Sequence, residues 1–600
     1  MPNTLDAAFN KDTIAASIST KYVDWQTARS KWNEERNELR GYLFATSTRD
    51  TTNKQLPWKN STVTPKLTQI RDNLHANYMA ALFPREQWFK WQSSDKDGLS
   101  KEKRDTIEAY MSTKLNASDF ELVVSQLVLD YIDYGNAFAA HEYVCIKKTD
   151  PATKQEATLY SGPRAFRISP LDIVFDPTAL GFNQSPTIVR RLKSVGDIEK
   201  DIINKPSLGY KPETVAKIKA LRGSTIDTID ALKNDGMIID GFGSLSIYFD
   251  SGMVELLDFY GDIYDADTKT LHTDQVITVA DRRWVLRMQE NKSWIGSKPI
   301  KHVGWRMRPD NVWAQGPLDQ LVGMQYRVDH LENLKADVFD QIAHPVVEIS
   351  GASAEDFKFG PGEVFHGGDE GALKLHRPDA NALAADMEIA TLMNRMEELA
   401  GAPRQAMGIR TPGEKTKYEV QVLENGAGRI FQAKVSWFER NILEPLLDSM
   451  LEEAVREMDT KDQVRMLDPQ YGSAAFKDIT KDDITAKGKF YAIGARHFAE
   501  QARFTQELTQ TLQIVQAMPQ VLPHISGKNV AKALSEVMGW HSFEIVKDNV
   551  AITEQQETKR LIDAAGEQVQ AEAGTPSELQ DSDFVPPEEA AMEVPRNGAQ

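Results

Sequence analysis

Apolar residues recur at steps of three and four between Gly316 and Pro345, which is the periodicity of an α-helix. Gly316-Pro317 supplies a turn followed by a proline suited to a first helical turn, and Pro345 ends the pattern. We therefore predict a helix over 317–343, about 27 residues and roughly 40 Å long. Its apolar stripe consists of Leu321, Met324, Val328, Leu331, Leu334, Val338 and Ile342.

The other faces of this predicted helix carry charge, which makes the helix unsuited to a core interior or a membrane. A narrow apolar stripe between mixed charges allows two interpretations. The helix packs along one stripe on the surface of its own chain, as most such helices do, or the stripe forms a lateral seam against copies of itself. The charged residues are Asp319, Arg327, Asp329, Glu332, Lys335, Asp337 and Asp340.

The hydrophobic pattern elsewhere predicts an α+β fold in which helix predominates. Thr64-Pro65 opens one helix as N-cap and first-turn proline, Pro84 ends it, and Pro445 should disturb another. Helices are predicted over 12–45, 64–83, 101–115, 119–134, 386–399, 417–458, 498–518, 528–538 and 553–571, with a mostly polar helical segment over 194–235. Strands are predicted over 138–146, 165–168, 173–175, 187–192, 245–249, 254–260, 276–280, 284–288, 300–305 and 346–349.

Three aromatic residues, Trp88, Phe89 and Trp91, follow the end of the helix over 64–83. Aromatic rings near lysine and arginine can stack on bases. A buried hydrophobic anchor is the commoner role of such a cluster, and we interpret it in that way.

Charge narrows the range of functions. The 600-residue chain has 88 acidic and 70 basic residues, so its net charge is −18. Tight binding of nucleic acid requires a surplus of lysine and arginine at the phosphates, and that surplus is missing. An acidic wall would still let a polyanion slide past, although acidity also serves solubility alone. The sequence has neither an apolar run of about eighteen residues nor a signal-peptide pattern, so we expect no membrane insertion.

Searches for reactive motifs give no catalytic site, no metal site and no cofactor site. The P-loop, the His-Glu-x-x-His helix and the Gly-x-Ser-x-Gly turn are all missing from the sequence. Cys145 is the single cysteine, which excludes internal disulfides, and we expect it in the core of a strand. His330 and His344 are interpreted as surface or helix-end residues rather than metal ligands. Asp329, Glu332 and Asp337 are acidic enough to bind a divalent cation, but alternating charges of this kind usually form a solvated face. We therefore expect a protein that is not an enzyme.

Several stretches together resemble the portal proteins, or head-to-tail connectors, of tailed bacteriophages, particularly the short-tailed type. The resemblance covers roughly residues 12–460, and its motifs are specific as an ordered set rather than singly. The stretches are Pro57-Trp-Lys-Asn-Ser-Thr-Val-Thr-Pro-Lys-Leu-Thr-Gln-Ile-Arg-Asp-Asn-Leu74, Asp133-Tyr-Gly-Asn-Ala-Phe138, Ile168-Ser-Pro-Leu-Asp-Ile-Val-Phe-Asp-Pro177, Pro299-Ile300 through Gly304-Trp-Arg306, Trp313-Ala-Gln-Gly-Pro-Leu318, the predicted helix with Gln325, Asp329, Leu331 and Asn333, and the helix–Gly-x-Pro–helix of 386–458.

The resemblance implies a ring of about twelve subunits at one capsid vertex of the virion, assembled in the host cytoplasm. Double-stranded DNA would pass through its channel during packaging and ejection. Partners would be a terminase motor, which supplies the ATPase that this chain lacks, head-tail adaptor and tail proteins, the scaffold and the major capsid protein. Two alternatives are another structural or internal virion protein without a DNA channel, and an enzyme with an unrecognised site.

The resemblance also implies a division of the chain. The parts are an N-terminal wing over 1–243, a β-rich clip and adjoining wing over 244–316, a stem helix over 317–345, a further wing part with tunnel loop and long helix over 346–497, and a helical crown over 498–572. The composition of 573–600 predicts a disordered acidic tail after them. The tunnel loop maps to 375–386 with Leu375, His376, Arg377 and Asn381, or alternatively to 409–416. The stem seam would use Leu321, Met324, Val328, Leu331, Val338 and Ile342.

Overall fold

The computed structural model divides the chain into two compact units, Met1–Glu500 and Gln501–Gln600. All residues described below belong to the first unit. The predicted crown helices, the acidic tail, the strand over 245–249 and the alternative loop over 409–416 lie outside them. The structure describes residues 4–48, 51, 60–84, 88–94, 101–149, 156–205, 208–221, 238–240, 253–294, 298–349, 373–376, 384–400, 430–458, 461–467 and 474–493.

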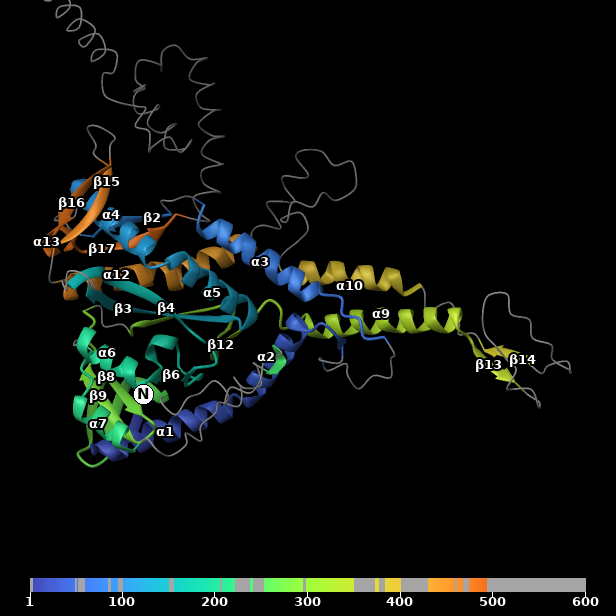
Figure 1. Ribbon diagram of the computed structural model, residues 1–600, viewed down its shortest axis with the longest axis horizontal. Helices are drawn as coiled ribbons and strands as arrows, with labels where there is room; N and C mark the ends of the chain where they lie inside the picture. Colours follow the sequence, from blue (N-terminus) through green and yellow to red (C-terminus); the bar gives the residue numbers. More distant parts are fainter. Residues whose placement is uncertain are drawn as a thin grey trace, which may run out of the picture. The chain divides into compact units, whose positions relative to one another are not determined.

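A six-stranded sheet has the order β5-β6-β7-β8-β9, with β1 added in parallel beside the end of β7 (Figure 1). Side chains alternate along β7, so Leu257 and Phe259 face the helix α1 while Val254 and Leu256 face α6 and α7. The sheet is therefore covered on both faces. Its elements are β1 (Leu5–Ala7), β5 (Ile173–Phe175), β6 (Thr187–Ser194), β7 (Met253–Asp265), β8 (Thr270–Ala280), β9 (Trp284–Glu290), α1 (Lys11–Ala28), α6 (Val195–Asn204) and α7 (Pro212–Leu221).

This sheet crosses the boundary that the sequence suggested between residues 243 and 244. Strand β6, on one side of that boundary, pairs with β7, on the other side, over the whole length of β6. The two segments thus share one sheet. Composition along the chain could not reveal this, because β6 ends at Ser194 and its partner β7 begins only at Met253.

A second sheet, of three strands in the order β10-β3-β4, lies between two hydrophobic clusters. Ala137 and Ala139 of β3 face the main helical core, and Phe138 and Ala140 face a cluster of aromatic residues. The strands are β3 (Asn136–Thr149), β4 (Glu156–Ile168) and β10 (Ile300–Gly304). The aromatic cluster includes residues of η4 (Phe182–Gln184) and of β12 (Asn311–Gln315), which pairs with β11 (Arg306–Arg308).

The main core is formed by helices with two small two-stranded sheets, β15–β16 and β2–β17, at its side. Trp88, Phe89 and Trp91 are buried in it, which confirms their interpretation as a hydrophobic anchor. The elements are α2 (Ser30–Phe44), α3 (Lys66–Leu82), α4 (Lys101–Ala117), α5 (Phe120–Asp133), α9 (Val322–Ala343), α10 (Asp386–Leu399), η9 (Glu439–Leu443), α12 (Glu444–Glu457), α13 (Lys481–Ile484), β2 (Phe89–Ser93), β15 (Asp462–Leu467), β16 (Ala474–Ile479) and β17 (Gly488–Ala492).

The fold is mixed α+β, and helix outweighs strand, as predicted. The predicted helix over 12–45 is two helices, because Arg29 between α1 and α2 has non-helical torsions of φ −100° and ψ 14°. Pro445 has the expected effect on its helix. The turn just before it is a π-helix, η9, since a proline supplies no N–H and its ring crowds the preceding turn.

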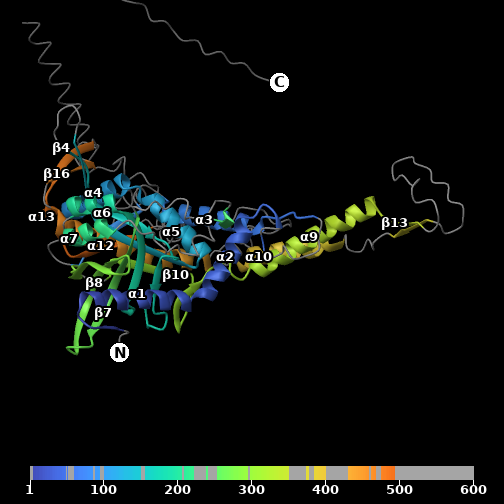
Figure 2. The same ribbon diagram turned by 60° about the horizontal axis from the view of Figure 1, so that its bottom comes forward.

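Helix α9 begins at Val322 rather than at Pro317. Residues 317–321 form a turn, because Leu318 and Leu321 insert into the main core. From there α9 lies side by side with α10 in both views (Figures 1 and 2). None of the helices described here is long and apolar enough to cross a membrane.

Candidate functional site

The chain enters α9 through a junction built from segments far apart in the sequence. Gly135 has φ +68°, and a Cβ there would lie 2.3 Å from the backbone nitrogen of Gly316. The fully buried side chain of Asn136 makes two hydrogen bonds to the backbone of β12. Its Nδ2 donates to the Ala314 carbonyl at 2.9 Å, and its Oδ1 accepts from the Ala314 N–H at 3.0 Å. The N–H of Trp305 donates to the Gly135 carbonyl at 2.8 Å.

Ion pairs fasten helices α2 and α3 to this junction. The Arg36 guanidinium of α2 contacts the Asp319 carboxylate and donates to the Asp133 carbonyl at 3.2 Å. Arg71 of α3 makes a bidentate pair with the Asp133 carboxylate, at 2.7 and 2.8 Å. Asp319 also accepts from the Gly316 N–H at 2.9 Å, which closes the turn before α9. Both arginine side chains are largely buried, so the start of α9 is fixed in position.

The stretch Ile168–Pro177 reaches the same place. The Trp313 ring stacks on Phe175, with centroids 4.5 Å apart and an interplanar angle of 17°. The N–H of Val312 donates to the Pro177 carbonyl at 3.1 Å. Five of the stretches that carry the resemblance to portal proteins, those between Pro57 and Leu318, therefore meet around one junction, although they are spread over more than 250 residues of sequence.

A polar stripe on α9 holds residues 60–67 of the same chain. The N–H groups of Thr62 and Thr64 donate to Asn333 Oδ1 at 2.8 Å and to Asp329 Oδ1 at 2.9 Å. Asn333 Nδ2 donates in return to the Thr62 carbonyl at 2.8 Å. The stripe consists of Gln325, Asp329, Asn333 and Asp337. Gln325 bonds to Thr64 and Leu67, Asp329 to Thr64, Asn333 to Thr62, and Asp337 to Asn60.

The two backbones match in spacing. Four residues of helix rise about 6.0 Å, and two residues of extended chain rise about 6.6 Å. A stripe at every fourth helical position can therefore bind every second residue of an extended segment without strain. Because Asp329 is fully buried beneath the segment, burial raises its pKa to about 6, opposed by the bonds from Thr64 and Gln325.

Sequence reasoning missed this stripe because it interpreted Asp329 and Asp337 as part of a solvated face. Asp329 is in fact fully buried, and Asp337 accepts a backbone hydrogen bond from Asn60 at 3.0 Å. The pair of neutral amide side chains, Gln325 and Asn333, could have indicated the stripe. Placed at four-residue steps with Asp329, such amides favour binding of a backbone over ion pairing.

The proposed seam residues lie mostly in the core of their own chain, which corrects their assignment to a contact between subunits. Leu321, Val328 and Leu331 belong to the main core, and Met324 packs against it. Val338 is also buried, at 8% exposure, while Ile342 is half-buried. The stripe is apolar because it faces α2 and α3 of the same molecule. An aspartate at Leu331 would disrupt this core and would report on folding rather than assembly.

The predicted tunnel loop over 375–386 falls only partly within the described residues. Leu375 and His376 belong to strand β14 (Leu373–His376), which pairs antiparallel with β13 (Val346–Ile349). This corrects the start of the loop, since a strand occupies its first two positions. Arg377 and Asn381 lie outside the described residues. Asp386 is the first residue of α10, as the sequence predicted.

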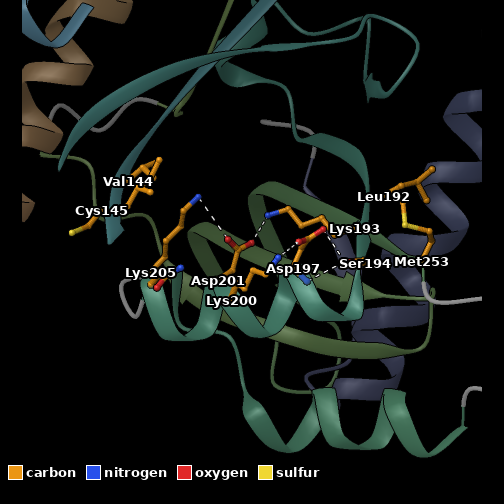
Figure 3. A pocket seen from close by; sticks show the side chains of 12 residues that line it. Val144, Cys145, Leu192, Lys193, Ser194, Asp197, Lys200, Asp201, Lys205 and Met253 are labelled. Atoms are coloured by element: carbon orange, nitrogen blue, oxygen red, sulfur yellow. Dashed lines mark hydrogen bonds and ion pairs between the residues drawn. The ribbon is translucent and has the colours of Figure 1, made fainter. Parts of the chain in front are cut away.

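A pocket of about 400 Å³ lies between β3, β6 and α6 (Figure 3). Cys145 is part of its lining and is partly exposed, which corrects its expected place in the core of a strand. The lining residues are Val144, Cys145, Ile146, Leu192, Lys193, Ser194, Asp197, Lys200, Asp201, Asn204, Lys205 and Met253.

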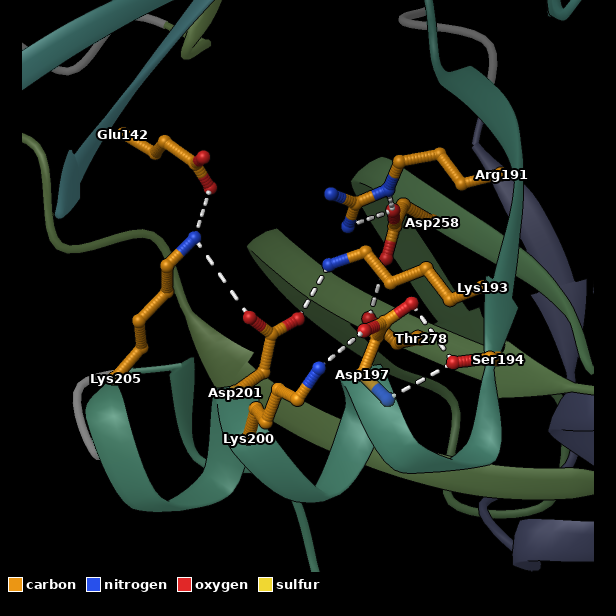
Figure 4. Close-up of polar contacts among 10 residues, drawn as sticks. All are labelled: Glu142, Arg191, Lys193, Ser194, Asp197, Lys200, Asp201, Lys205, Asp258 and Thr278. Atoms are coloured by element: carbon orange, nitrogen blue, oxygen red, sulfur yellow. Dashed lines mark hydrogen bonds and ion pairs between the residues drawn. The ribbon is translucent and has the colours of Figure 1, made fainter. Parts of the chain in front are cut away.

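The charges around this pocket bind one another (Figure 4). Lys205 lies between Glu142, at 2.8 Å, and Asp201, at 3.8 Å, and Lys193 contacts the second oxygen of Asp201. Lys200 pairs with Asp197 at 3.2 Å, and Ser194 caps α6 by accepting from the Asp197 N–H at 3.0 Å. Three lysines thus meet three carboxylates. This network joins α6 to β3 and β6, which is a structural role.

Behind the pocket, a second network joins β6, β7 and β8. The Arg191 guanidinium binds the Asp258 carboxylate, with Nε at 2.5 Å from Oδ2. Thr278 donates its hydroxyl to the other oxygen of Asp258, also at 2.5 Å. The positive charges of Arg191 and Arg287 keep the pKa of Asp258 low, although burial acts against them. These polar groups tie the strands together on the face that α6 covers.

A buried carboxyl group lies where α12 packs on β3. Glu453 has 14% side-chain exposure, and its Oε2 lies 3.8 Å from Nε2 of His141. Burial raises the pKa of Glu453 to about 7, opposed by Arg456 and the N–H of Tyr143, while Glu457 and Glu142 add to the increase. Burial lowers the pKa of His141 to about 3, so the imidazole is neutral at neutral pH.

Glu453→Gln is expected to stabilise the protein at alkaline pH. The folded pKa of about 7 lies above the ordinary 4.5, so the stability linked to this carboxyl is present at low pH and falls as pH rises through 7. Between pH 5.5 and 8.5 the free energy of unfolding of the wild type should fall by about 2 kcal/mol relative to that of the variant. Urea unfolding of both proteins at the two pH values measures the difference. The exposed Glu121→Gln is the control, and an equal gain in both variants would contradict the assignment.

The described residues contain no cluster of three or more histidine, cysteine, aspartate or glutamate side chains that could hold a metal ion. Neither models of known protein families nor the curated proteins give a match to this chain. The junction and the stripe on α9 are therefore the features on which a function can be argued.

Proposed function

We propose that this chain is the portal protein of a tailed bacteriophage. About twelve copies would form a ring at one capsid vertex, through which double-stranded DNA is packaged and ejected. The observation that carries the proposal is the meeting of the portal-like stretches around Gly135 and Gly316 at the start of α9. Sequence motifs that lie together in the folded chain support a resemblance in structure better than motifs that only follow one another in the expected order along the sequence.

In this proposal α9 is the stem helix, and its attachment suits a load-bearing part. The polar stripe and residues 60–67 brace one face, while the main core braces another. Ion pairs to α10 brace it further, through Arg327 with Glu388 and Lys335 with Asp386. Movement of this helix would require the breaking of buried bonds, so a subunit could transmit force along it without bending.

The remaining parts keep the assignments that the resemblance implies, with one change. The segment over 244–316 forms clip and adjoining wing together with β5 and β6, because it shares their sheet. The tunnel loop begins after β14 and contains Arg377 and Asn381, or lies at 409–416. Residues 498–572 form the crown. The net charge of −18 suits a channel wall that does not hold the DNA it conducts.

The mass of the assembled protein tests this function. A closed ring of twelve copies of the 67.4 kDa chain should have a mass of roughly 810 kDa. Light scattering after size exclusion would measure the mass, and electron-microscopy class averages would show a central hole. A monomer at all salt and protein concentrations would contradict the proposal.

A specific alternative is an internal virion protein that binds its partners without a channel. Assembly into particles without a central hole would favour it. A ring that supports filling of capsids by a terminase, but fails when 377–385 is deleted, would favour the portal and its tunnel loop.

A further inference from the structure

Three apolar side chains are exposed together beside the start of η9. Trp437 is 42% exposed, Met307 is 43% exposed and Ile430 is 62% exposed. Trp437 Nε1 donates to the Gly304 carbonyl at 3.2 Å, and the Met307 sulfur covers Gly304 so closely that a Cβ there would clash with it. Ile430 is two helical turns before Trp437 on the same face. We call these residues and the cations around them the Trp437 patch.

Cations surround the apolar centre of the Trp437 patch. Lys434 donates to the Trp305 carbonyl, and the nearby charge of Arg306 adds to the effect of burial in lowering its pKa. Arg440 follows Trp437 by three residues on an exposed position, and Arg308 is exposed on the adjoining hairpin. Three carboxylates accompany these four cations: Asp310 on the hairpin, the buried Glu439 at the start of η9, and Glu444, whose pKa burial raises while Arg440 opposes the increase. The patch therefore carries an excess of positive charge.

The composition of this patch is that of an interface centre. Tryptophan, methionine and arginine are the residues enriched where proteins bind one another, and tryptophan and arginine are the commonest sources of large binding energy. Trp437 is also held rigidly by its bond to Gly304, so little side-chain entropy would be lost on docking.

We propose that the Trp437 patch binds an acidic surface on a second copy of this chain. Charge complementarity identifies the occupant, because a chain with 18 more acidic than basic residues offers the patch more negative than positive side chains. A contact of the patch with itself across a two-fold axis is disfavoured, since it would place two surfaces of the same net charge against each other. The contact is therefore heterologous, and repeated heterologous contacts close into rings or continue as filaments.

This inference rests on the proposed function, because it names the contact that would build the ring. It differs from the seam suggested by the sequence in both position and chemistry. The seam was an apolar stripe on α9 that the chain itself covers. The Trp437 patch lies on the helix over 430–438 and on the β11–β12 hairpin, and its charge selects a different face of the neighbouring copy.

Charge reversal at two exposed positions tests the contact. Because Arg308 also donates to the Trp313 carbonyl at 3.2 Å, the folding of the variant is checked by urea unfolding. The double variant Arg308→Glu with Arg440→Glu should raise at least tenfold the protein concentration at which half of the chains are assembled, as measured by sedimentation velocity. Trp437→Ser should act in the same direction. Matched controls are Arg283→Glu, at an exposed position in the turn between β8 and β9, and Trp294→Ser, where the tryptophan is 66% exposed. Both controls should assemble like the wild type.

Hydroxyl-radical footprinting of the wild type gives a readout that does not depend on a variant folding. Oxidation of Trp437 should be slower in the assembled protein than in the dissociated protein, while oxidation of Trp294 should not change. Wild-type rings in which Trp437 stays fully reactive would overturn the contact and leave the portal proposal standing. A stable two-fold dimer that buries Trp437 would overturn the heterologous geometry. A wild type that never assembles would contradict both proposals.

Discussion

Gly135→Ala is expected to destabilise the protein by about 3 kcal/mol or more, the largest effect of a single methyl group that we foresee. An alanine at φ +68° is strained in itself, and its Cβ would lie 2.3 Å from the Gly316 nitrogen and 2.5 Å from the Gln315 carbonyl carbon. Both obstacles are backbone atoms. They cannot retreat, because Asn136 holds the adjoining Ala314 by two hydrogen bonds.

Thermal or urea unfolding of the variant would measure this effect. The control is Gly323→Ala on α9, where a Cβ would meet no atom within 4 Å. Alanine is favoured over glycine in a helix, so the control should gain about 0.5–1 kcal/mol. If the two variants had equal stability, the close approach of Gly135 to Gly316 would be wrong.

The second large effect is expected from Arg29→Ala, with a loss of about 3–5 kcal/mol. The Arg29 guanidinium donates to the carbonyls of Pro170, Leu171 and Ile173 at 2.8, 2.5 and 2.7 Å. Only 8% of the residue is exposed, so removal of the side chain would leave buried carbonyl groups without their donor. The loss should appear as a lower urea midpoint with little change in the slope of the transition.

Arg29→Lys separates the charge from the shape of the side chain. An ammonium group keeps the charge, but a single nitrogen cannot replace a planar fork aimed at three carbonyls. The lysine variant should therefore fall between the wild type and Arg29→Ala. Arg283→Ala, which removes an exposed arginine, should cost little. A lysine variant as stable as the wild type would show that charge alone matters at this position.

Local elements could be predicted from the sequence because their signals are local. Apolar residues at steps of three and four predicted α3, α4 and α5 with ends within a few residues of those in the structure. The strand predicted over 173–175 agrees with β5. Burial of Trp88, Phe89 and Trp91 followed from their apolar bulk. In each case the residues that determine the element lie inside it, so one stretch of sequence contains the whole cause.

Features that depend on distant partners could not be predicted in this way. Arg29 looks like one more charged residue on a long helix, and only the carbonyls of Pro170 to Ile173 explain why the helix stops there. The stripe on α9 looks solvated until residues 60–67 cover it. Small strands such as β2 and β17 escaped notice, since each is defined by the other almost 400 residues away.

The attachment of residues 60–64 to α9 also sets an order for folding. The bond between Thr62 and Asn333 joins positions 271 residues apart, so it cannot form until most of the first unit has been synthesised. Contacts of such long range slow folding, because the chain loses loop entropy before it gains their energy. During synthesis the carboxylate of Asp329 therefore emerges into water and is dehydrated only in a late step. A nascent chain would keep α9 undocked, and unable to assemble, until its neighbours in space are in place.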